Sequence, residues 1–218
     1  MLLIPKQEPR ALSNFWVPVE MPQFFRQFSR RERLFHQGEP SESLHIITSG
    51  YVKLVRLTAS GDERILDILG QGDVLGIASL GQMNYQLDAI ALSDVTTQVF
   101  ADASLSELVR DQPESLDKLM QSLSQQLFDA WQRVSDTTET VQIRLIKLLL
   151  HYAVKFGHIE GDWLKLKLRV THEDIASMIS SSRISVTNEM SDLRKMGLLE
   201  GGRGLYRLHE AALRDYIS

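Results

Sequence analysis

The hydrophobic and polar positions follow two different periods along the chain. Between residues 33 and 100, short apolar runs rich in valine, isoleucine and leucine alternate with turns that contain glycine. Glycine suits tight turns because it adopts positive φ without a steric cost. Many short strands separated by such turns are typical of a β-sandwich or barrel. We predict strands at residues 33–36, 44–48, 51–58, 64–69, 74–75, 89–92 and 96–100.

The first 30 residues have neither pattern. They contain Pro5, Pro9, Pro18 and Pro22, and proline breaks long regular elements. We expect irregular chain there, with one short helix over residues 21–28.

From Pro113 onwards the period becomes helical. Proline fits the first turn of a helix, and after it apolar positions recur at alternating steps of four and three as far as residue 141. This 3.5-residue repeat predicts a long helix that either packs on the chain's own sheet or pairs with a second copy. Because the stripe is narrow and long, we favour a dimer helix. Its predicted interface consists of Leu116, Met120, Leu123, Leu127, Ala130, Val134, Thr137 and Val141.

Residues 142–179 are predicted to form a helix, a strand and a second helix. Apolar spacing predicts a helix over residues 142–156 that ends at Gly157, and alternation predicts a strand over residues 163–170. Thr171 is then placed to accept a hydrogen bond from the first turn of a helix over residues 173–179.

A second helix and a hairpin complete a winged helix-turn-helix. The serines at 180–182 make a turn and offer a new N-cap, and a helix over residues 183–196 stops at Gly197. Residues 198–208 contain a glycine-rich turn between two short strands. A short helix, a tight turn, a second helix and a wing present the second helix to the major groove of DNA. The buried face of that second helix is predicted to be Val186, Met190 and Leu193.

The other face of the second helix carries side chains that read or hold DNA. Arginine reads guanine through O6 and N7, asparagine reads adenine, and hydroxyl groups suit phosphates or base edges. The alternative is a helical hairpin with an ordinary polar face. The predicted DNA-binding residues are Thr171, His172, Ser182, Arg183, Ser185, Thr187, Asn188, Ser191 and Arg203.

Charge and composition agree with a polyanion partner. The net charge is −4, but residues 141–218 hold 12 Lys and Arg against 9 Asp and Glu, whereas residues 1–140 hold 12 against 19. A basic end on an acidic body suits contact with nucleic acid at that end. The absence of cysteine excludes disulfides and thiolate metal sites. No apolar run approaches the ~20 residues of a membrane span, and no leader pattern is present, so we expect a cytoplasmic protein with no membrane contact.

The chain resembles the CRP/FNR family of bacterial transcription regulators over nearly its whole length. The most specific matches are residues 35–39, 46–54, 61–64 and 72–76, whose glycines match the turns of the family's cyclic-nucleotide-binding-type β-roll. The resemblance implies an α+β fold: an N-terminal double-stranded β-roll (jelly roll), a long dimerisation helix and a C-terminal winged helix-turn-helix. The implied domains are residues 1–111, comprising an N-terminal extension and the β-roll, the dimerisation helix 112–141 and the DNA-binding domain 142–218. It also implies a homodimer that reads a pseudo-palindromic site in double-stranded DNA and contacts RNA polymerase.

The sequence departs from the family where cyclic AMP would bind. Cyclic-AMP-responsive members carry a Gly-Glu-Leu stretch and an Arg-Ser pair, but here the matching positions read Gly76-Ile77-Ala78 and fall near Tyr85-Gln86. No Arg or Lys lies between Arg64 and Arg110, and a buried phosphate without a cation or a cluster of donors is costly. Trp131, where the family faces the nucleobase, could itself fill the pocket. We therefore expect no usual cyclic-AMP binding and predict no cofactor. An effector pocket, if one is used, would consist of Gly76, Ile77, Ala78, Tyr85, Gln86 and Trp131.

The sequence leaves three alternative functions open. A regulator gated by haem would need an axial histidine, for which His36, His45, His151 and His158 are present. A small unidentified ligand is another effector, and a cupin-like metal enzyme is the third alternative. Cupins need a His-x-His pair, which His45-Ile46-Ile47 does not supply, so we expect no enzymatic activity. On the DNA-reading helix the family's later arginine is replaced by Asn188, which predicts an unfamiliar target sequence.

Overall fold

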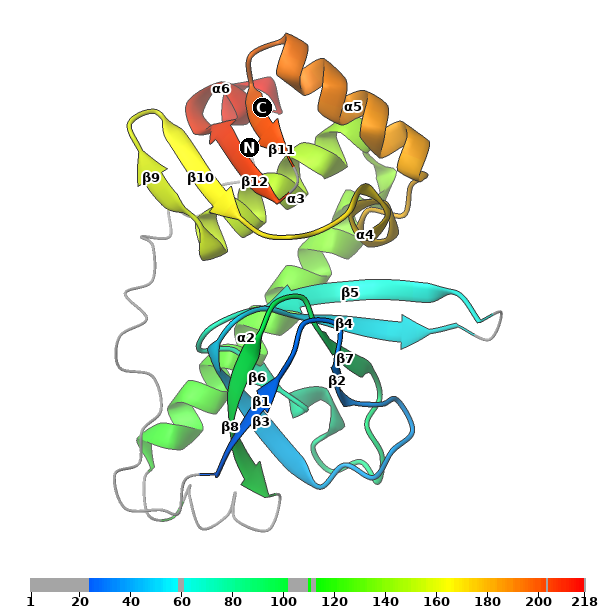
Figure 1. Cartoon of the computed structure of the whole chain (residues 1–218), viewed down its shortest axis with the longest axis vertical. Helices are drawn as coiled ribbons and strands as arrows, with labels where there is room; N and C mark the ends of the chain where they lie inside the picture. Colours follow the sequence, from blue (N-terminus) through cyan, green and yellow to red (C-terminus); the bar gives the residue numbers. More distant parts are fainter. Residues whose placement is uncertain (1–23, 59–60, 102–109, 111–112, 203, 218) are drawn as a thin grey trace. The chain divides into compact units, whose positions relative to one another are not determined.

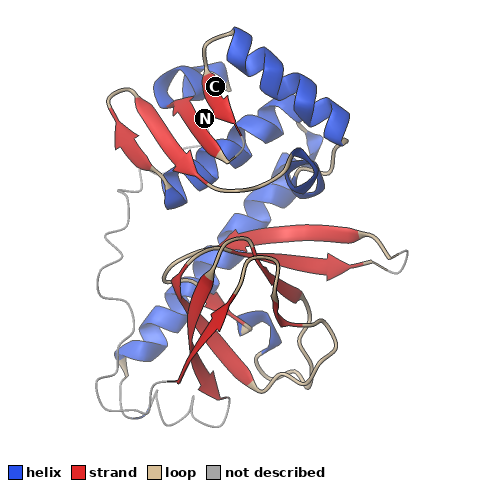
Figure 2. Cartoon of the chain, in the orientation of Figure 1, coloured by secondary structure: helices blue, strands red, loops and turns tan. Residues whose placement is uncertain are grey.

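A computed structural model describes residues 24–58, 61–101, 110, 113–202 and 204–217, without the side chains of residues 114, 115 and 137. The described chain forms two compact units, an N-terminal unit of residues 24–132 and a C-terminal unit of residues 133–217. The N-terminal unit consists of strands with one long helix, whereas helices and strands alternate in the C-terminal unit (Figures 1 and 2). The fold is therefore α+β, as predicted.

The N-terminal unit is built from two antiparallel four-stranded sheets, with strand orders β1-β8-β3-β6 and β2-β7-β4-β5. The predicted strands are all present, with ends that differ by a few residues. Their bounds are β1 Phe24–Phe28, β2 Arg33–Phe35, β3 Ser43–Ser49, β4 Val52–Leu57, β5 Glu63–Leu69, β6 Val74–Leu75, β7 Asp88–Ala91 and β8 Val95–Ala101, with a short 3-10 helix η1 at Ile77–Ser79.

The helix predicted over residues 21–28 is wrong in its described part, because Phe24–Phe28 is the strand β1. It pairs with β8 from Phe24 opposite Val99 to Phe28 opposite Val95. The pairing supplies hydrogen bonds along an edge of β8 that would otherwise be open, and this non-local gain overrides the local pattern. Residues 21–23 lie outside the described residues.

Apolar side chains on both faces of β3 explain why this strand is almost continuously hydrophobic. Ile47 lies in the core between the two sheets with Val52, Leu69 and Leu75. Ile46 belongs to a second cluster on the other face, which also includes Leu44, Val74, Ile77, Phe100 and Leu119 of the long helix. A strand that is covered on both faces loses the alternation of a half-exposed strand.

The long helix α2 spans Glu114–Ser135 and is shorter than predicted. A 3-10 helix η2 follows at Asp136–Thr138, and α3 begins at Val141, because the Oγ1 atom of Thr140 accepts a hydrogen bond from the Ile143 amide and caps a new helix. The prediction of one helix as far as residue 141 is thus wrong: residue 137 lies in η2 and Val141 lies on α3. No helix among the described residues is both long and apolar enough to span a membrane.

The C-terminal unit packs helices on one face of a four-stranded sheet with the order β11-β12-β10-β9. Gly157 ends α3, as predicted, but its conformation is extended. The glycine is required by space, because a Cβ atom there would clash with the Ala153 oxygen and would lie 2.7 Å from the Lys165 oxygen. The bounds are α3 Val141–Phe156, β9 His158–Glu160, β10 Trp163–Lys167, α4 His172–Met178, α5 Arg183–Lys195, β11 Leu199–Gly202, β12 Leu205–His209 and α6 Glu210–Tyr216.

Candidate nucleic-acid interface and effector region

The first helix of the helix-turn-helix, α4, begins with a complete capping box. The Asp174 amide donates to Oγ1 of Thr171 at 3.0 Å, and the Thr171 amide donates to Oδ2 of Asp174 at 2.8 Å. Two backbone donors that a helix start leaves unpaired are thereby satisfied. The predicted cap at Thr171 is confirmed, and the helix begins one residue earlier than predicted.

The turn between α4 and α5 is fixed from both sides. Ser180 adopts a positive φ of 52°, which lets the Ser181 amide donate to the Ala176 oxygen at 2.9 Å. Arg144 of α3 donates from Nη1 to the Ile179 oxygen at 2.7 Å and so pairs a carbonyl at the end of α4. Ser182 then caps α5, because its Oγ atom accepts from the Ser185 amide at 3.0 Å. The predicted turn and second cap are confirmed.

The buried face of α5 is the one predicted. Val186, Met190 and Leu193 are fully buried, and Ala176 of α4 is buried beside them. A small residue in α4 allows the two helices to approach closely. Figure 1 shows α5 at the outer edge of the C-terminal unit, which leaves the opposite face of the helix open.

The centre of that open face is Ile184, which the sequence analysis left out. Ile184, Asn188, Ser191 and Lys195 follow one another at steps of four, three and four, opposite the buried face. Ile184 is 74% exposed. The spacing of the apolar positions alone could have identified this residue, since an isoleucine opposite a helix's buried face has no core to join.

Arg183 and Thr187 lie at the edge of the open face. Thr187 is exposed, but its hydroxyl donates to the Arg183 oxygen at 2.8 Å and lies 2.9 Å from Nδ1 of His172. Burial and the positive charges of Arg194 and Arg183 lower the pKa of His172. The neutral imidazole therefore dominates at neutral pH and ties α4 to α5.

Hydroxyl groups lie at the start of α5. The Oγ atoms of Ser182 and Ser185 are 2.9 Å apart, so they bond to each other in the first turn. A helix start suits a phosphate, and here it also carries hydroxyl groups.

The wing is attached to α5 through Arg194. Its Nε donates to the Gly201 oxygen at 3.0 Å and its Nη1 donates to the Met190 oxygen at 3.3 Å. Gly204 has a φ of 89°, and a Cβ atom there would lie 2.8 Å from the Cα atom of Arg169, so the wing turn lies close against the end of β10. The predicted wing residue at 203 lies outside the described residues.

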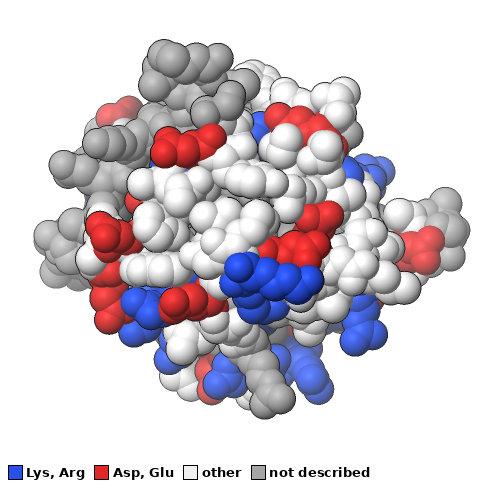
Figure 3. Space-filling model, turned by 90° about the horizontal axis from the view of Figure 1, so that it is seen from above, with Lys and Arg blue, Asp and Glu red and all other residues white. Residues whose placement is uncertain are grey.

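On the face drawn in Figure 3, the described charged side chains do not form one continuous basic patch, because Lys and Arg alternate with Asp and Glu. Several pairs explain this, among them Arg207 with Glu200 at 2.7 Å and Lys195 with Asp192 at 2.8 Å. These basic side chains are thus partly neutralised by acids of the same chain.

One residue of the predicted effector pocket, Tyr85, lies in the core of the β-roll. The ring of Tyr85 stacks on that of Phe35 with centroids 3.9 Å apart, and its hydroxyl donates to the Ser43 oxygen at 2.7 Å. Tyr85 and Ile77 are buried, whereas Ala78 and Gln86 are exposed. Trp131 is 62% exposed in the single chain. Tyr85 therefore belongs to the core of the roll, whereas Trp131 lies at the surface of the single chain.

Three backbone donors of this region, the amides of Ser79, Tyr85 and Gln86, are paired within the chain. Gly76 has a φ of 85° and starts η1, where the Ser79 amide donates to the Gly76 oxygen at 2.8 Å. The Gln86 amide donates to Oγ of Ser79 at 3.1 Å, and the Tyr85 amide donates to the Glu39 oxygen at 2.8 Å. A phosphate that used these three amides would have to displace these bonds.

His45 continues the polar chain behind Tyr85. Its ring nitrogens lie 3.2 Å from Oγ of Ser43 and 3.1 Å from Oγ1 of Thr97. Both nitrogens therefore have partners within the roll and neither is poised as an axial haem ligand. Burial, with a smaller contribution from Arg26, lowers the pKa of His45 to about 4.

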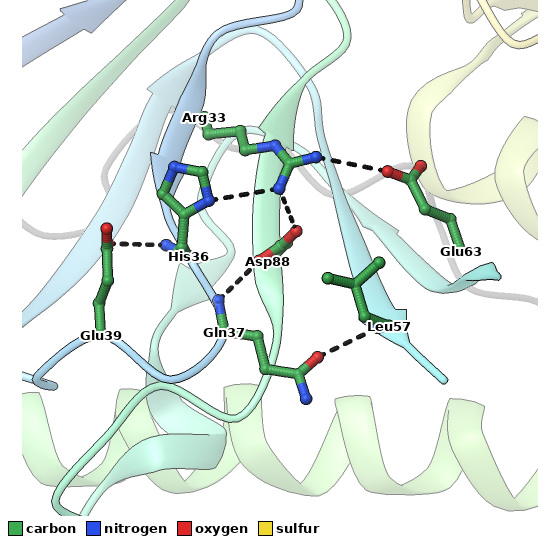
Figure 4. A network of polar contacts seen from close by, with 7 residues as sticks. All are labelled: Arg33, His36, Gln37, Glu39, Leu57, Glu63 and Asp88. Atoms are coloured by element: carbon green, nitrogen blue, oxygen red, sulfur yellow. Dashed lines mark hydrogen bonds and ion pairs between the residues drawn. The ribbon is translucent and has the colours of Figure 1, made fainter. Parts of the chain in front are cut away.

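Arg33 makes a network that the sequence did not indicate. Its Nη1 donates to Oδ2 of the buried Asp88 at 2.6 Å, and its Nη2 donates to Glu63 at 3.4 Å (Figure 4). The Gln37 amide donates to the other Asp88 oxygen at 2.6 Å, and Oε1 of Gln37 accepts from the Leu57 amide at 3.0 Å. Arg33 thus neutralises a buried carboxylate and joins β2 to the β4–β5 hairpin. Its guanidinium group is therefore paired with carboxylates of the chain itself rather than with a bound phosphate.

Comparison with known proteins assigns the family. The profile of the cyclic nucleotide-binding domain matches residues 25–112, and that of the Crp-like helix-turn-helix domain matches residues 143–216. A CRP-like cAMP-activated global transcriptional regulator of Mycobacterium tuberculosis is 31% identical over 189 residues, which are 86% of this chain and 81% of the relative. The chain belongs to the CRP/FNR family. It is a sequence-specific DNA-binding transcription regulator, and its relatives are regulators rather than enzymes.

Two further proteins illustrate the spread of the CRP/FNR family around this chain. The global nitrogen regulator of Synechococcus elongatus is 28% identical over 184 residues, which are 83% of each chain. The structure of FixK2 from Bradyrhizobium japonicum has a TM-score of 0.79 at 19% identity and covers 91% of this chain and 98% of its own. This likeness shows that the two proteins share their fold.

In this CRP/FNR regulator, α2 carries an apolar stripe that the single chain leaves open. Its large members are between 40% and 69% exposed: Leu116, Met120, Leu123, Leu127 and Val134. Ala130 is half-buried and Val141 is half-buried at the start of α3. The opposite side of α2 contacts the roll, where Gln126 donates to the Val74 oxygen at 3.2 Å.

Proposed function

We propose that this CRP/FNR regulator works as a homodimer that reads a pseudo-palindromic site and does so without cyclic AMP. One α5 helix would enter the major groove of each half-site. The observation that carries the proposal is the exposed stripe of α2. A monomer rarely exposes so many large apolar side chains in one line, and a 3.5-residue repeat is the pattern by which helices pair.

Sedimentation equilibrium at micromolar concentration tests the dimer. We expect a dimer for the wild type and a monomer for the double variant Leu123→Glu, Leu127→Glu, because two charges on each helix would meet apolar side chains of the partner. Gln121→Glu is the matched control, since Gln121 is exposed on a face of α2 away from the stripe. A wild-type monomer, or a double variant that still dimerises as tightly, contradicts the assignment of the stripe.

At the DNA, Arg183 is proposed to read a base edge and Asn188 to read an adenine. Ser182, Ser185, Thr171 and His172 would hold the phosphate backbone, together with Ser191 and the wing arginine at 203. These roles follow from the exposed or half-buried positions of the described residues and from the chemistry of arginine, asparagine and hydroxyl groups. Bound in this way in the cytoplasm, the dimer would regulate transcription through contact with RNA polymerase.

The absence of a cyclic-AMP response is proposed on two observations. Tyr85 and Phe35 stack in the core of the roll, and the amides of Ser79, Tyr85 and Gln86 are paired within the chain. The Mycobacterium tuberculosis relative is cAMP-activated by its name, so it serves as the positive control. Isothermal titration calorimetry with cyclic AMP should give no binding heat with this chain and a clear signal with the relative. Micromolar binding to this chain would overturn the proposal.

A further inference from the structure

Ile184 is the unusual residue of the DNA-reading helix. Among the described large hydrophobic residues only Met83 is more exposed, and Ile184 lies in the first turn of α5. An isoleucine there gains nothing from the core, because the buried face of α5 is on the other side. Its side chain is the only large apolar one on the open face of α5, between polar neighbours.

The position of Ile184 beside Asn188 limits what it meets. Residues four apart on a helix are side-chain neighbours, so whatever base Asn188 reaches, Ile184 lies against the same or the adjoining base pair. Asparagine pairs with adenine through N6 and N7 in the major groove. The apolar group of an A·T pair in that groove is the 5-methyl group of thymine.

We propose that Ile184 packs against the 5-methyl group of a thymine in each half-site and, with Asn188, makes the site select A·T pairs. The inference rests on the proposed entry of α5 into the major groove. Burial of the thymine 5-methyl group against the Ile184 side chain would favour thymine over cytosine and over uracil, because both of these bases lack that methyl group. Arg183, at the edge of the same face, would read a neighbouring guanine.

The test uses DNA that differs only in that methyl group. A bound site is first selected from random duplexes, and each thymine of its half-site is then replaced by deoxyuridine, symmetrically in both half-sites. Loss of one buried methyl group lowers the affinity roughly fourfold. Because each replacement removes one methyl group from both half-sites, we expect roughly fifteenfold weaker binding at the thymine that Ile184 contacts. Fluorescence anisotropy at fixed salt measures the ratio.

The variant Ile184→Ala removes the partner of the methyl group. It should bind the thymine and the deoxyuridine duplexes equally, with an affinity close to that of the wild type on deoxyuridine. Because the side chain is exposed and alanine favours helix, the fold should not be weakened. Ile159→Ala is the matched control, since Ile159 on β9 is 63% exposed away from α5, and it should keep the wild-type ratio.

Two results separate the inference from the function on which it rests. Sequence-specific binding with no deoxyuridine effect at any thymine, or an effect that persists in Ile184→Ala, overturns the role of Ile184 and leaves DNA reading by α5 intact. If the wild type selects no sequence at all, the proposed reading mode fails and the inference falls with it.

Discussion

His172 and Thr187 are joined by a 2.9 Å contact between Nδ1 and Oγ1, and the Thr187 hydroxyl donates to the Arg183 oxygen at 2.8 Å. A hydroxyl has one hydrogen, so Thr187 must accept from His172, which places the imidazole proton on Nδ1. The Nε2 atom of the neutral ring then carries no hydrogen and gains one only when the ring is protonated. This one hydroxyl links the first turns of α4 and α5.

Replacing Thr187 by valine removes both bonds while keeping the shape of the side chain. Specific DNA affinity should fall about threefold to tenfold, as for the loss of about 1 kcal/mol of hydrogen bonding. Base preference should not change, because the hydroxyl is committed within the protein. Thr187→Ser should retain most of the affinity in the same anisotropy titration. A Thr187→Val variant that binds as tightly as the wild type would show that the link is dispensable.

DNA affinity should rise as the pH falls from about 8 to 6. Burial, Arg194 and Arg183 keep the pKa of His172 below its usual 6.5 in the free protein. A phosphate near Nε2 favours the protonated ring, which raises its pKa in the complex, so binding takes up protons. Titrations at constant ionic strength measure this slope, and His172→Gln should flatten it. An equal slope in the variant would assign the effect to another group.

The N-caps of the helix-turn-helix could be predicted because they depend on local chemistry. Thr171 and Ser182 cap helices through amides only a few residues away, and a three-residue turn leaves the backbone little choice. The strand β1 could not be predicted, because its partner β8 lies about 70 residues further along the chain.

Other parts of the site depend on contacts that no local pattern contains. Arg33 meets Asp88 across 55 residues, and Tyr85 reaches Ser43 across 42. The end of α2 at Ser135 could not be predicted, because the heptad spacing of apolar residues continues through η2 into α3. Ile184 lies outside a prediction based on polar residues alone, because the groove of DNA also presents methyl groups.

Gly157 tests how tightly α3 is packed against β10. Alanine there would place a methyl group against two backbone oxygens, so the free energy of unfolding should fall by about 1–3 kcal/mol. Gly161→Ala is the comparison, because Gly161 has a φ of 63° but nothing within 4 Å of a new Cβ atom. That variant should lose only the cost of a left-handed residue, about 1 kcal/mol. Urea unfolding measures the loss of stability in both variants. An equal loss in Gly157→Ala and Gly161→Ala would argue that backbone conformation, and not lack of space, requires glycine at position 157.

His45 should make the fold sensitive to acid. Its pKa is about 4 in the folded chain and near 6.5 when unfolded, so its stabilising contribution is complete above pH 6.5 and is lost as the pH falls towards 4. Between pH 7 and 5 the wild type should lose about 2 kcal/mol more than His45→Gln in urea unfolding. Equal losses in the two proteins would place the acid sensitivity elsewhere.

The central claim is that α5 reads the DNA sequence as one half of a twofold-symmetric reader. Selection of bound fragments from random DNA, run in parallel with the wild type and Arg183→Ala, tests it most directly. We predict a pseudo-palindromic site for the wild type, with half-sites about 34 Å apart. Arg183→Ala should lose about 1–3 kcal/mol of specific binding and its preference at one position of each half-site, while salt-dependent non-specific binding persists. A site without twofold symmetry, or an Arg183→Ala variant with unchanged affinity and base preference, would contradict the account.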